Sequence, residues 1–451
     1  MNRRTFLAGG AAWLGAGLVS RLAAQAQRPR PSPSQLAWQR DELALFLHFG
    51  VNTFTDREWG DGKEDPSIFA PSALDARQWA RVARASGFRA VILTAKHHDG
   101  FCLWPTRTTK HSVASSPWRA GQGDLVKEFV AACRGEGLRP GLYLSPWDRN
   151  NPLYGDSPRY NDLYVDQLRE LLTNYGDIHE VWFDGANGEG PNGRKQEYDW
   201  PRVWGEVRKL QPKAVMFSDA GPDVRWCGNE SGSAGDPNWS TVDAKIVPVP
   251  GMPGKHIIDA LQHGQADGPV WRPAECDTSI RPGWFHHPAE DGRVRSADRL
   301  MDLYFRSVGH NGKLLLNVPP TRDGVLHATD VARLQQFAER RREVFANDFA
   351  RARRVRWSRS GPTTASGVLD IGRPRSFSIV RLEEPIEEGQ TVARYSIHGA
   401  GSNRVFKPLA KGTTIGYARL DRVVATDVRY VRVDIEEAVA APEPLRVRLF
   451  A

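Results

Sequence analysis

The sequence predicts an α/β protein: a (β/α)8 barrel of the TIM type followed by a C-terminal antiparallel β-sandwich. Helix-then-strand units succeed one another between residues 43 and 345, as expected for a parallel α/β fold. Each expected strand is short and apolar and runs directly into polar residues, as strands do at the reactive rim of a barrel. Beyond about residue 350, apolar and polar residues alternate between turns that contain Gly or Pro, which is typical of an antiparallel sandwich.

Residues 1–26 are expected to form an export signal rather than part of the fold. Arg3 and Arg4 precede a mildly apolar run that ends at Val19, and Ala24-Gln-Ala26 offers a cleavage site. Paired arginines are typical of twin-arginine signals, and the apolar run is too short for stable membrane insertion. We therefore expect export to the periplasm or beyond the cell, a catalytic barrel over residues 27–348 and a sandwich over residues 349–451.

The barrel strands are expected from apolar runs and the helices from apolar residues at helical spacing. The expected strands are residues 43–47, 90–94, 139–144, 181–183, 214–217, 224–226, 270–275 and 314–316. The expected helices are residues 74–86, 125–134, 162–175, 200–210, 297–308 and 330–345. A doubly wound open sheet is the alternative, but it normally carries a glycine-rich fingerprint after its first strand. His48-Phe-Gly-Val-Asn52 stands at that position and is not such a fingerprint.

The C-terminal region is expected to contain five sandwich strands, at residues 354–357, 377–381, 392–397, 414–419 and 429–435. A role in supporting the barrel is favoured over independent sugar binding.

Composition narrows the function classes. The net charge is +8, and removal of the first 26 residues, which hold three Arg and no acid, lowers it to +5. Because these charges form no long basic run, nucleic-acid binding is not expected. The four cysteines show no CxxC pair, so neither a zinc knuckle nor a disulfide framework is indicated. Many of the 15 tryptophans stand beside Gly, Pro or acids, which suits stacking on sugar faces or bases, or covering the rim of a large core.

The first candidate catalytic and binding residues follow two of the expected strands. The strand at residues 181–183 delivers Asp184 onto a glycine-containing turn, where it is either a reactive carboxylate or a cap. His97 and His98 follow the second strand. Adjacent residues on an extended segment point to opposite sides, so a shared metal is disfavoured, and hydrogen bonds from the imidazoles to a polyhydroxyl ligand are favoured. No metal or cofactor is expected, and the lack of a G-x-S-x-G elbow leaves serine-hydrolase chemistry unsupported.

A glycoside hydrolase usually needs a second carboxylate besides one such as Asp184. The candidates are Asp219, Glu230, Glu275, Glu58 and Asp99. Glu230 lies in a segment flanked by Trp and Gly, where Trp226 could help to raise its pKa for a general-acid role. Spacing alone does not choose between Glu230 and Glu275.

Six stretches together resemble the family 29 glycoside hydrolases, the retaining α-L-fucosidases, over residues 38–345. They are Phe46-Leu-His-Phe-Gly50, Glu58-Trp-Gly60, Thr94-Ala-Lys-His-His-Asp-Gly-Phe101, Tyr143-Leu-Ser-Pro-Trp147, Trp182-Phe-Asp-Gly185 and Leu315-Leu-Asn-Val318. The resemblance implies a covalent mechanism in which Asp184 attacks the anomeric carbon of fucose. It also implies a sugar site built from His48, Trp59, His97, His98, Tyr143, Trp147 and Trp284.

The Gly-Asn-Glu230 block resembles the subgroup that removes α-1,3- and α-1,4-linked fucose from branched, Lewis-type oligosaccharides. Glu230 is therefore assigned as acid/base, with Glu275 held in reserve and otherwise expected to help recognise the branching galactose. The expected partner is a fucosylated oligosaccharide or glycoprotein glycan. The alternatives are a broad fucosidase acting on α-1,2 or aryl fucosides, a barrel hydrolase for another sugar, and a non-catalytic fucose-binding lectin.

Overall fold

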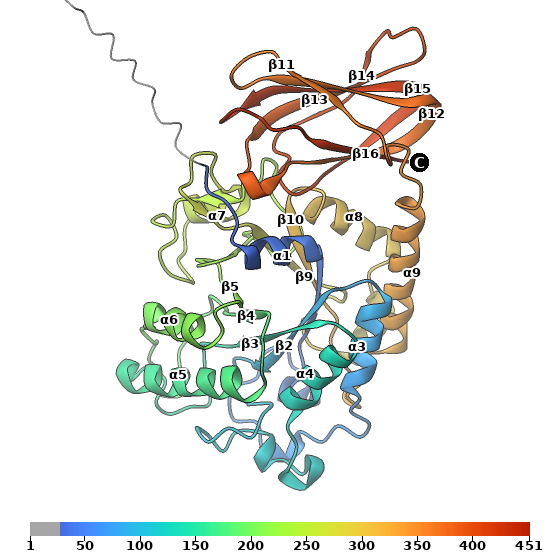
Figure 1. Ribbon diagram of the computed structural model, residues 1–451. Coiled ribbons are helices and arrows are strands. Elements are labelled where there is room, and N and C mark those ends of the chain that lie inside the picture. The colour runs from blue at the N-terminus through green and yellow to red at the C-terminus, as the bar shows by residue number, and fades with distance from the viewer. Residues whose placement is uncertain (1–27) are drawn as a thin grey trace, which may run out of the picture.

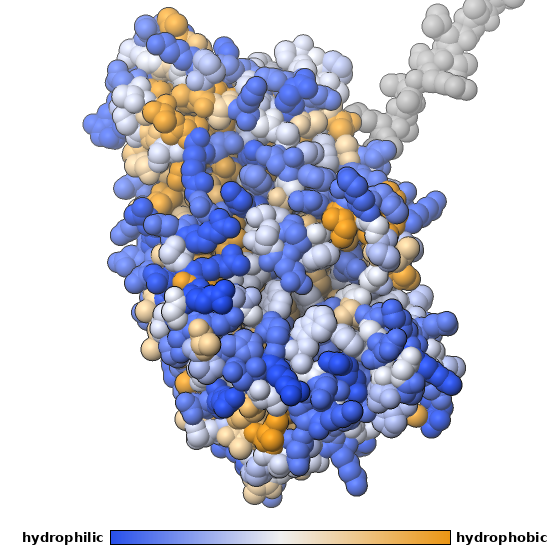
Figure 2. All heavy atoms as spheres, turned by 180° about the vertical axis from the view of Figure 1, so that it is seen from behind, coloured by the Kyte–Doolittle hydropathy of each residue, from blue (hydrophilic) through white to orange (hydrophobic). Residues whose placement is uncertain are grey.

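The computed structural model describes residues 28–451, so the expected export signal at residues 1–26 lies outside the described residues. The described chain forms an α/β barrel with an all-β domain at one end of it (Figure 1). Seen from behind, hydrophilic side chains cover most of the surface, and hydrophobic ones gather mainly over the all-β domain (Figure 2). Within residues 28–451, no helix has the length and apolar character needed to cross a membrane.

Eight strands form one parallel sheet in the order β5-β4-β3-β2-β1-β10-β9-β6. They are β1 (Leu43–Leu47), β2 (Ala90–Lys96), β3 (Arg139–Leu144), β4 (Glu180–Trp182), β5 (Val215–Phe217), β6 (Arg225–Trp226), β9 (Ala274–Ser279) and β10 (Gly312–Asn317). A parallel bridge between Phe217 and Val224 joins β5 to the start of β6, so the two ends of the sheet meet. The predicted barrel is confirmed.

The seventh barrel strand differs from the expected run at residues 270–275. Val270–Trp271 forms β8, which pairs antiparallel with β7 (Thr241–Val242) outside the barrel. The barrel strand β9 begins only at Ala274. Pro273 lies between the two strands, and a proline interrupts a ladder because it has no N–H to donate. The barrel strand therefore extends to Ser279 instead of ending at Glu275.

Helices surround the barrel (Figure 1). They are α1 (Pro33–Asp41), α2 (Val51–Thr55), α3 (Ala76–Ala85), α4 (Leu125–Gly135), α5 (Ser157–Asn174), α6 (Trp200–Leu210), α7 (Lys255–His263), α8 (Ala297–Ser307) and α9 (Ala328–Val344). Short 3₁₀ turns lie at Pro66–Ile68, Val113–Ser115, Trp118–Gly121, Pro288–Arg293 and Ile386–Glu388. Asp75, Asp124, Asp199 and Ser296 begin four of the expected helices, since each side chain accepts a hydrogen bond from the backbone N–H three residues on. Helix α7 was not expected from the sequence.

The barrel interior has a charged layer beneath an aromatic one. At the amino ends of the strands, Nζ of Lys313 lies 3.2 Å from Glu180 and 3.6 Å from Glu275. Trp38 of α1 closes this end, because its ring lies 4.4 Å from the Lys313 ammonium and its Nε1 donates to Glu180 at 3.0 Å. Above this layer the rings of Phe46, Tyr143, Trp182 and Phe217 pack together, and they form the floor of the carboxyl-end rim.

The C-terminal domain is antiparallel, as predicted. Its strands are β11 (Arg356–Arg359), β12 (Ala365–Glu383), β13 (Val392–Ala400), β14 (Lys407–Gly412), β15 (Arg419–Ala438) and β16 (Arg446–Phe450). They pair in the order β11-β12-β15-β13-β14, with β16 on β12. Irregularities between Asp370 and Ile379 bend the long β12–β15 ladder around one apolar core.

The prediction of a strand at residues 414–419 was wrong. Ile415 is buried, Gly416 adopts a positive φ of 62°, and its N–H binds the carboxylate of Glu384. The apolar residues of this stretch pack at the junction with the barrel and form no ladder. Strand β14 was missed because its short sequence carries few apolar residues to mark a buried face. Strand β16 is only five residues long, but Val447, Leu449 and Phe450 are buried and could have marked it.

Candidate active site

Two adjoining lobes of one cavity lie at the carboxyl ends of the barrel strands. The first, of about 220 Å³, is lined by Phe46, His48, Trp59, His97, His98, Tyr143, Trp182, Asp184, Ala186, Glu230, Asp277 and Trp284. The second, of about 270 Å³, is lined by Trp182, Asp184, Gly185, Ala186, Phe217, Asp219, Trp226, Glu230, Gly251, Met252, Ile258, Leu261 and Asp277. Asp184, Glu230 and Asp277 therefore stand where the lobes meet. A concave site with apolar walls and a few convergent polar groups is typical of a small-molecule pocket.

Asp184 is held at both carboxylate oxygens. It follows β4, whose residues are buried up to the rim. The hydroxyl of Tyr143 donates to Oδ2 at 3.0 Å, and the backbone N–H of Ala186 donates to Oδ1 at 2.7 Å. Nε2 of His98 lies 3.9 Å from Oδ2. With 28% of its side chain accessible, Asp184 presents a fixed carboxylate edge to the cavity.

Glu230 differs from Asp184 in its surroundings. It lies on the loop after β6 and is exposed at the rim, yet it also lines both lobes. Partial loss of solvation, followed by the negative charge of Asp184, raises the pKa of Glu230. A carboxyl group whose surroundings raise its pKa is suited to the general-acid role.

Two of the histidines have their tautomers set by neighbours on other strands. Asn317 donates its amide to Ser279 and to the Trp284 carbonyl, so its oxygen accepts from Nδ1 of His48 at 2.8 Å. The hydroxyl of Ser145 donates to the Trp147 carbonyl, so it accepts from Nδ1 of His98 at 2.7 Å.

Both imidazoles are therefore neutral groups with the proton on Nδ1. Burial lowers the pKa of His48 to about 4 and also lowers the pKa of His98. Their Nε2 atoms are left as hydrogen-bond acceptors. For His98 this differs from the donation to a polyhydroxyl ligand that was expected of His97 and His98 from the sequence. His97 is buried, its Nδ1 has no hydrogen-bond partner among residues 28–451, and its ring stacks on Tyr143 with 5.7 Å between centroids.

The expected tryptophans occupy three different positions. Trp59 is 56% exposed at the rim and meets His98 and Trp147 edge to face. Trp147 lines neither lobe and packs against both Trp59 and His98 instead. Trp284 lines the first lobe, and its backbone N–H is bound by the carboxylate of Glu58.

Glu275 does not line the cavity. It is fully buried in the charged layer below, where Trp182 donates to it at 3.1 Å. Burial and the adjacent Glu180 raise the pKa of Glu275 well above its ordinary value. Of the other carboxylates considered, Asp219 lines the second lobe and accepts from the Gly251 N–H at 2.7 Å. Asp99 is buried and binds the N–H of Phe101.

Asp277 was missed from the sequence, although it lines both lobes. Burial, then the nearby Glu230, raises the pKa of Asp277 to about 8, and Nε1 of Trp226 donates to it at 2.8 Å. It lies two residues beyond Glu275 on β9, so both side chains face the barrel interior. The expected end of this strand at Glu275 hid that relationship. Within the described chain, no group of three or more His, Cys, Asp or Glu side chains is arranged to hold a metal ion.

Comparisons with known proteins agree with this geometry. The alpha-L-fucosidase family model matches residues 24–340. Alpha-L-fucosidase 1 of Arabidopsis thaliana is 42% identical over 445 residues, covering 92% of this chain and 86% of the plant protein.

Solved structures give the same result. A glycoside hydrolase 29 family member from an unknown rumen bacterium is 40% identical, with a TM-score of 0.85 over 94% of this chain and 78% of that chain. A family 29 fucosidase of Ruminococcus gnavus in complex with fucose is 30% identical, with a TM-score of 0.85 over 94% of this chain and 95% of that chain. The chain therefore belongs to the alpha-L-fucosidase family, family 29 of the glycoside hydrolases.

Proposed function

We propose that this α-L-fucosidase releases terminal α-1,3- and α-1,4-linked L-fucose from branched, Lewis-type glycans by a retaining double displacement. One observation carries the mechanistic part of this proposal. Asp184 and Glu230 line the same cavity, yet Asp184 is fixed by two donors while the pKa of Glu230 is raised. A retaining glycosidase needs one carboxylate that attacks and one carboxylic acid that protonates the leaving oxygen.

In the first step, an oxygen of Asp184 forms a bond to the anomeric carbon as the glycosidic C–O bond breaks. Glu230 transfers its proton to the departing oxygen, so the leaving sugar is neutral and a fucosyl ester remains on Asp184. In the second step, Glu230 removes a proton from water, whose oxygen attacks the same carbon and releases the Asp184 carboxylate. Fucose leaves with its original anomeric configuration, and Glu230 is again protonated.

We assign the fucose ring to the first lobe. The Nε2 atoms of His48 and His98 are acceptors, so they suit hydroxyl groups that donate hydrogen bonds. Trp284 and Phe46 present apolar ring surface, which suits the C5-methyl side of a deoxy sugar. His97 lies between these groups, against Tyr143.

The second lobe supports the preference for branched glycans. It continues past Asp184 and Glu230, and Trp226, Met252, Ile258 and Leu261 give it an apolar wall. Asp219 adds one polar group to this lobe. This combination suits the leaving sugars, which stack on rings through their C–H faces and donate hydroxyl protons to carboxylates.

The test compares fucose release from a Lewis-type trisaccharide and from an α-1,2-fucosylated disaccharide, with the Asp184→Asn protein as control. Proton NMR of the first turnovers identifies the anomer that forms before mutarotation. Release of α-fucose from the trisaccharide, abolished in the variant, supports the proposal. Preferential release from the disaccharide would reject the linkage assignment, and initial β-fucose would reject the retaining mechanism.

We also propose that residues 1–26 direct export, with the mature chain beginning near residue 27. N-terminal sequencing of the protein from isolated periplasm and culture medium tests this proposal. A variant with Arg3→Lys and Arg4→Lys is expected to stay inside the cell at full length. Export of this variant at the native level would contradict a twin-arginine route.

A further inference from the structure

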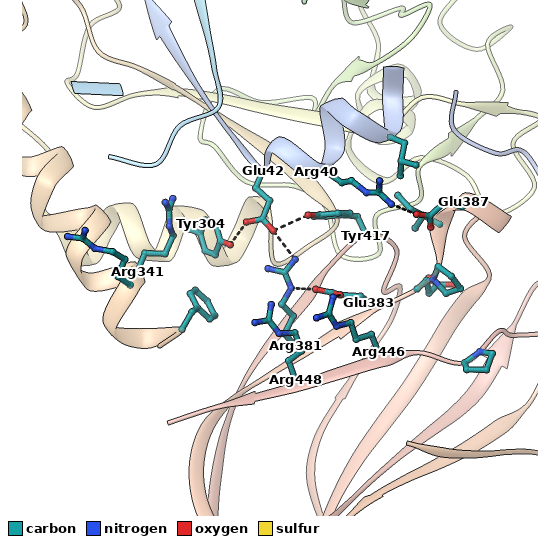
Figure 3. Close-up of a pocket in the computed structure, with 17 residues that line it drawn as sticks. Arg40, Glu42, Tyr304, Arg341, Arg381, Glu383, Glu387, Tyr417, Arg446 and Arg448 are labelled. Carbon is teal, nitrogen blue, oxygen red and sulfur yellow. Dashed lines mark hydrogen bonds and ion pairs between the residues drawn. The ribbon is translucent and has the colours of Figure 1, made fainter. Parts of the chain in front are cut away.

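A second, larger groove lies where the barrel meets the C-terminal domain. One part of it, of about 810 Å³, runs between α1, the end of α9 and strands β12 and β16 (Figure 3). A second part, of about 1000 Å³, runs along residues 345–357. The two parts share Phe345, Pro444, Arg446 and Arg448, so they form one continuous surface, called the junction groove below.

The junction groove is strongly basic. Six arginines line each part and two of them are shared, which makes ten in all. They are Arg40, Arg341, Arg342, Arg351, Arg353, Arg354, Arg375, Arg381, Arg446 and Arg448. Only five acids line the same surface, namely Glu42, Glu383, Glu384, Glu387 and Asp348. A surplus of five positive charges therefore gathers on one face, although the sequence shows no long basic run.

The five acids already have partners within the protein. Glu42 accepts from Arg381 at 2.8 Å, from Tyr304 at 2.6 Å and from Tyr417 at 3.1 Å, as the dashed lines in Figure 3 mark. Glu383 is bound by Arg381 at 2.6 Å, and Arg446 lies 3.6 Å from it.

The remaining three acids are also engaged. Asp348 pairs with Arg448 at 2.9 Å, and Glu387 pairs with Arg40. Glu384 is buried and accepts from the backbone N–H groups of Thr391, Val392 and Gly416.

Six of the arginines have no acidic partner within 4.0 Å anywhere in residues 28–451. They are Arg341, Arg342, Arg351, Arg353, Arg354 and Arg375. The side chains of Arg342, Arg351, Arg353 and Arg354 are exposed. Unneutralised guanidinium groups along a groove attract anions, and each can bind a sulfate or carboxylate through two parallel hydrogen bonds.

We propose that the junction groove binds a linear polysaccharide that carries sulfate or carboxylate groups. A hollow, elongated surface suits an extended chain better than a flat bilayer, and the rings of Phe345, Trp357 and Tyr417 offer stacking surface for sugars. Because an anchor of this kind would serve an enzyme that cleaves glycans, the inference rests on the proposed function.

The groove anchors the polymer and does not cleave it. Glu42 lies just before the amino end of β1, whereas Asp184 follows the carboxyl end of β4, so the groove and the cavity lie at opposite ends of the barrel. Binding at the groove therefore raises the local concentration of fucosylated branches on an anionic polymer. The expected kinetic effect is a lower KM for such polymers, with kcat unchanged.

The test measures binding of fluorescent heparin, an acidic polysaccharide, by anisotropy at about 50 mM and about 300 mM NaCl. Neutral dextran, a DNA duplex and phosphatidylglycerol vesicles are the competing probes. The groove variant combines Arg342→Gln, Arg353→Gln and Arg354→Gln. The matched variant combines Arg77→Gln, Arg84→Gln and Arg107→Gln, which removes three exposed arginines outside the groove that likewise lack an acidic partner in the described chain.

The native protein and the matched variant are expected to bind heparin equally, more weakly at the higher salt concentration and without binding dextran. The groove variant should bind about tenfold more weakly, equivalent to about 1.4 kcal/mol. Equal heparin binding by the two variants would overturn the proposal, as would tighter binding of DNA or vesicles than of heparin. All three proteins should hydrolyse an aryl fucoside equally. If the native protein does not hydrolyse the aryl fucoside, the proposed function is rejected, and the heparin-binding result still stands.

Discussion

The phenolic hydroxyl of Tyr143 donates a 3.0 Å hydrogen bond to Oδ2 of Asp184. Burial, then the charge of Asp184, raises the pKa of Tyr143 well above its ordinary value, so the hydroxyl stays protonated and remains a donor. Tyr143 pairs with Trp182 in the β3–β4 ladder, which places the donor beside the strand that carries Asp184. The orientation of the proposed nucleophile is therefore determined by the register of two neighbouring strands.

Replacement of Tyr143 by Phe should lower kcat for an aryl fucoside by about 10- to 100-fold, because a hydrogen bond to a charged acceptor contributes about 1.5–3 kcal/mol. Steady-state kinetics and thermal unfolding test this prediction. Tyr164→Phe is the matched control, since the Tyr164 hydroxyl donates to the Leu144 carbonyl at 2.7 Å and lines neither lobe. The control should lose stability and keep its kcat. Equal kcat values for native and Tyr143→Phe enzymes would show that the hydrogen bond does not orient the nucleophile.

Replacement of Glu230 by Ala should have an effect that depends on the leaving group. Fucosides of acidic phenols need little protonation and should react nearly normally in the first step, whereas oligosaccharides should lose about 10²- to 10⁴-fold. Native kcat/KM should fall as pH rises through the raised pKa of Glu230, and this alkaline limb should disappear in Glu230→Gln. Azide should restore turnover of Glu230→Ala and give α-fucosyl azide. Asp219→Asn is the control, and a similar leaving-group dependence in that protein would move the acid role away from Glu230.

Site residues that directly follow an expected strand could be predicted from the sequence. Asp184, His48 and His97 each follow an apolar run, so their place at the rim follows from the barrel pattern alone. How close a residue lies to the carboxyl end of its strand was harder to predict. Glu275 and Asp277 face the same interior, but only Asp277 is near enough to the carboxyl end to line the cavity.

The chemistry of the imidazoles could not be predicted from local sequence. The tautomer of His48 depends on Asn317, which is 269 residues away in the chain, and that of His98 depends on Ser145. The junction groove was missed for a similar reason. Five of its arginines lie close together in the chain, on α9 and the linker after it, but the other five come from α1, β12 and β16 and join them only when the two parts of the chain pack together.

Lys96 shows that the most recognisable motif of the chain also has a structural role. Its ammonium is fully buried and contacts Asp148 at 3.3 Å, Tyr160 at 3.2 Å and Gln167 at 2.9 Å. Lys96→Met should destabilise the protein by about 3–5 kcal/mol, because it leaves the buried Asp148 carboxylate without its positively charged partner.

Denaturant unfolding measures this effect, and the double variant with Asp148→Asn should be less destabilised than Lys96→Met alone. Lys255→Met provides the comparison, since it removes one member of the exposed Lys255–Asp259 pair and should cause no measurable change. If Lys96→Met loses only a little stability, water reaches this site.

Asp277 gives a prediction about stability and pH. Its folded-state pKa of about 8 lies above the value of about 3.9 expected in the unfolded chain. The protonated side chain therefore contributes stability that is fully present below about pH 4 and is lost as pH rises through about 8. Asp277→Asn removes this dependence and keeps an oxygen that can accept from Trp226. Between pH 4 and pH 8, native stability should fall relative to the variant by up to about 1.4 kcal/mol per pH unit.

Thermal and denaturant unfolding of both proteins across this range measures the difference. At about pH 6 the native side chain is uncharged, like its replacement, so kcat/KM of Asp277→Asn should stay within about threefold of native. Above about pH 8 the native enzyme gains a negative charge beside Glu230 and the variant does not, so the two alkaline limbs should separate. Parallel stability curves for the two proteins would show that Asp277 is already ionised in the folded state. Glu230 would then work beside two negative charges, those of Asp184 and Asp277, and the pKa of Glu230 would depend on Asp277.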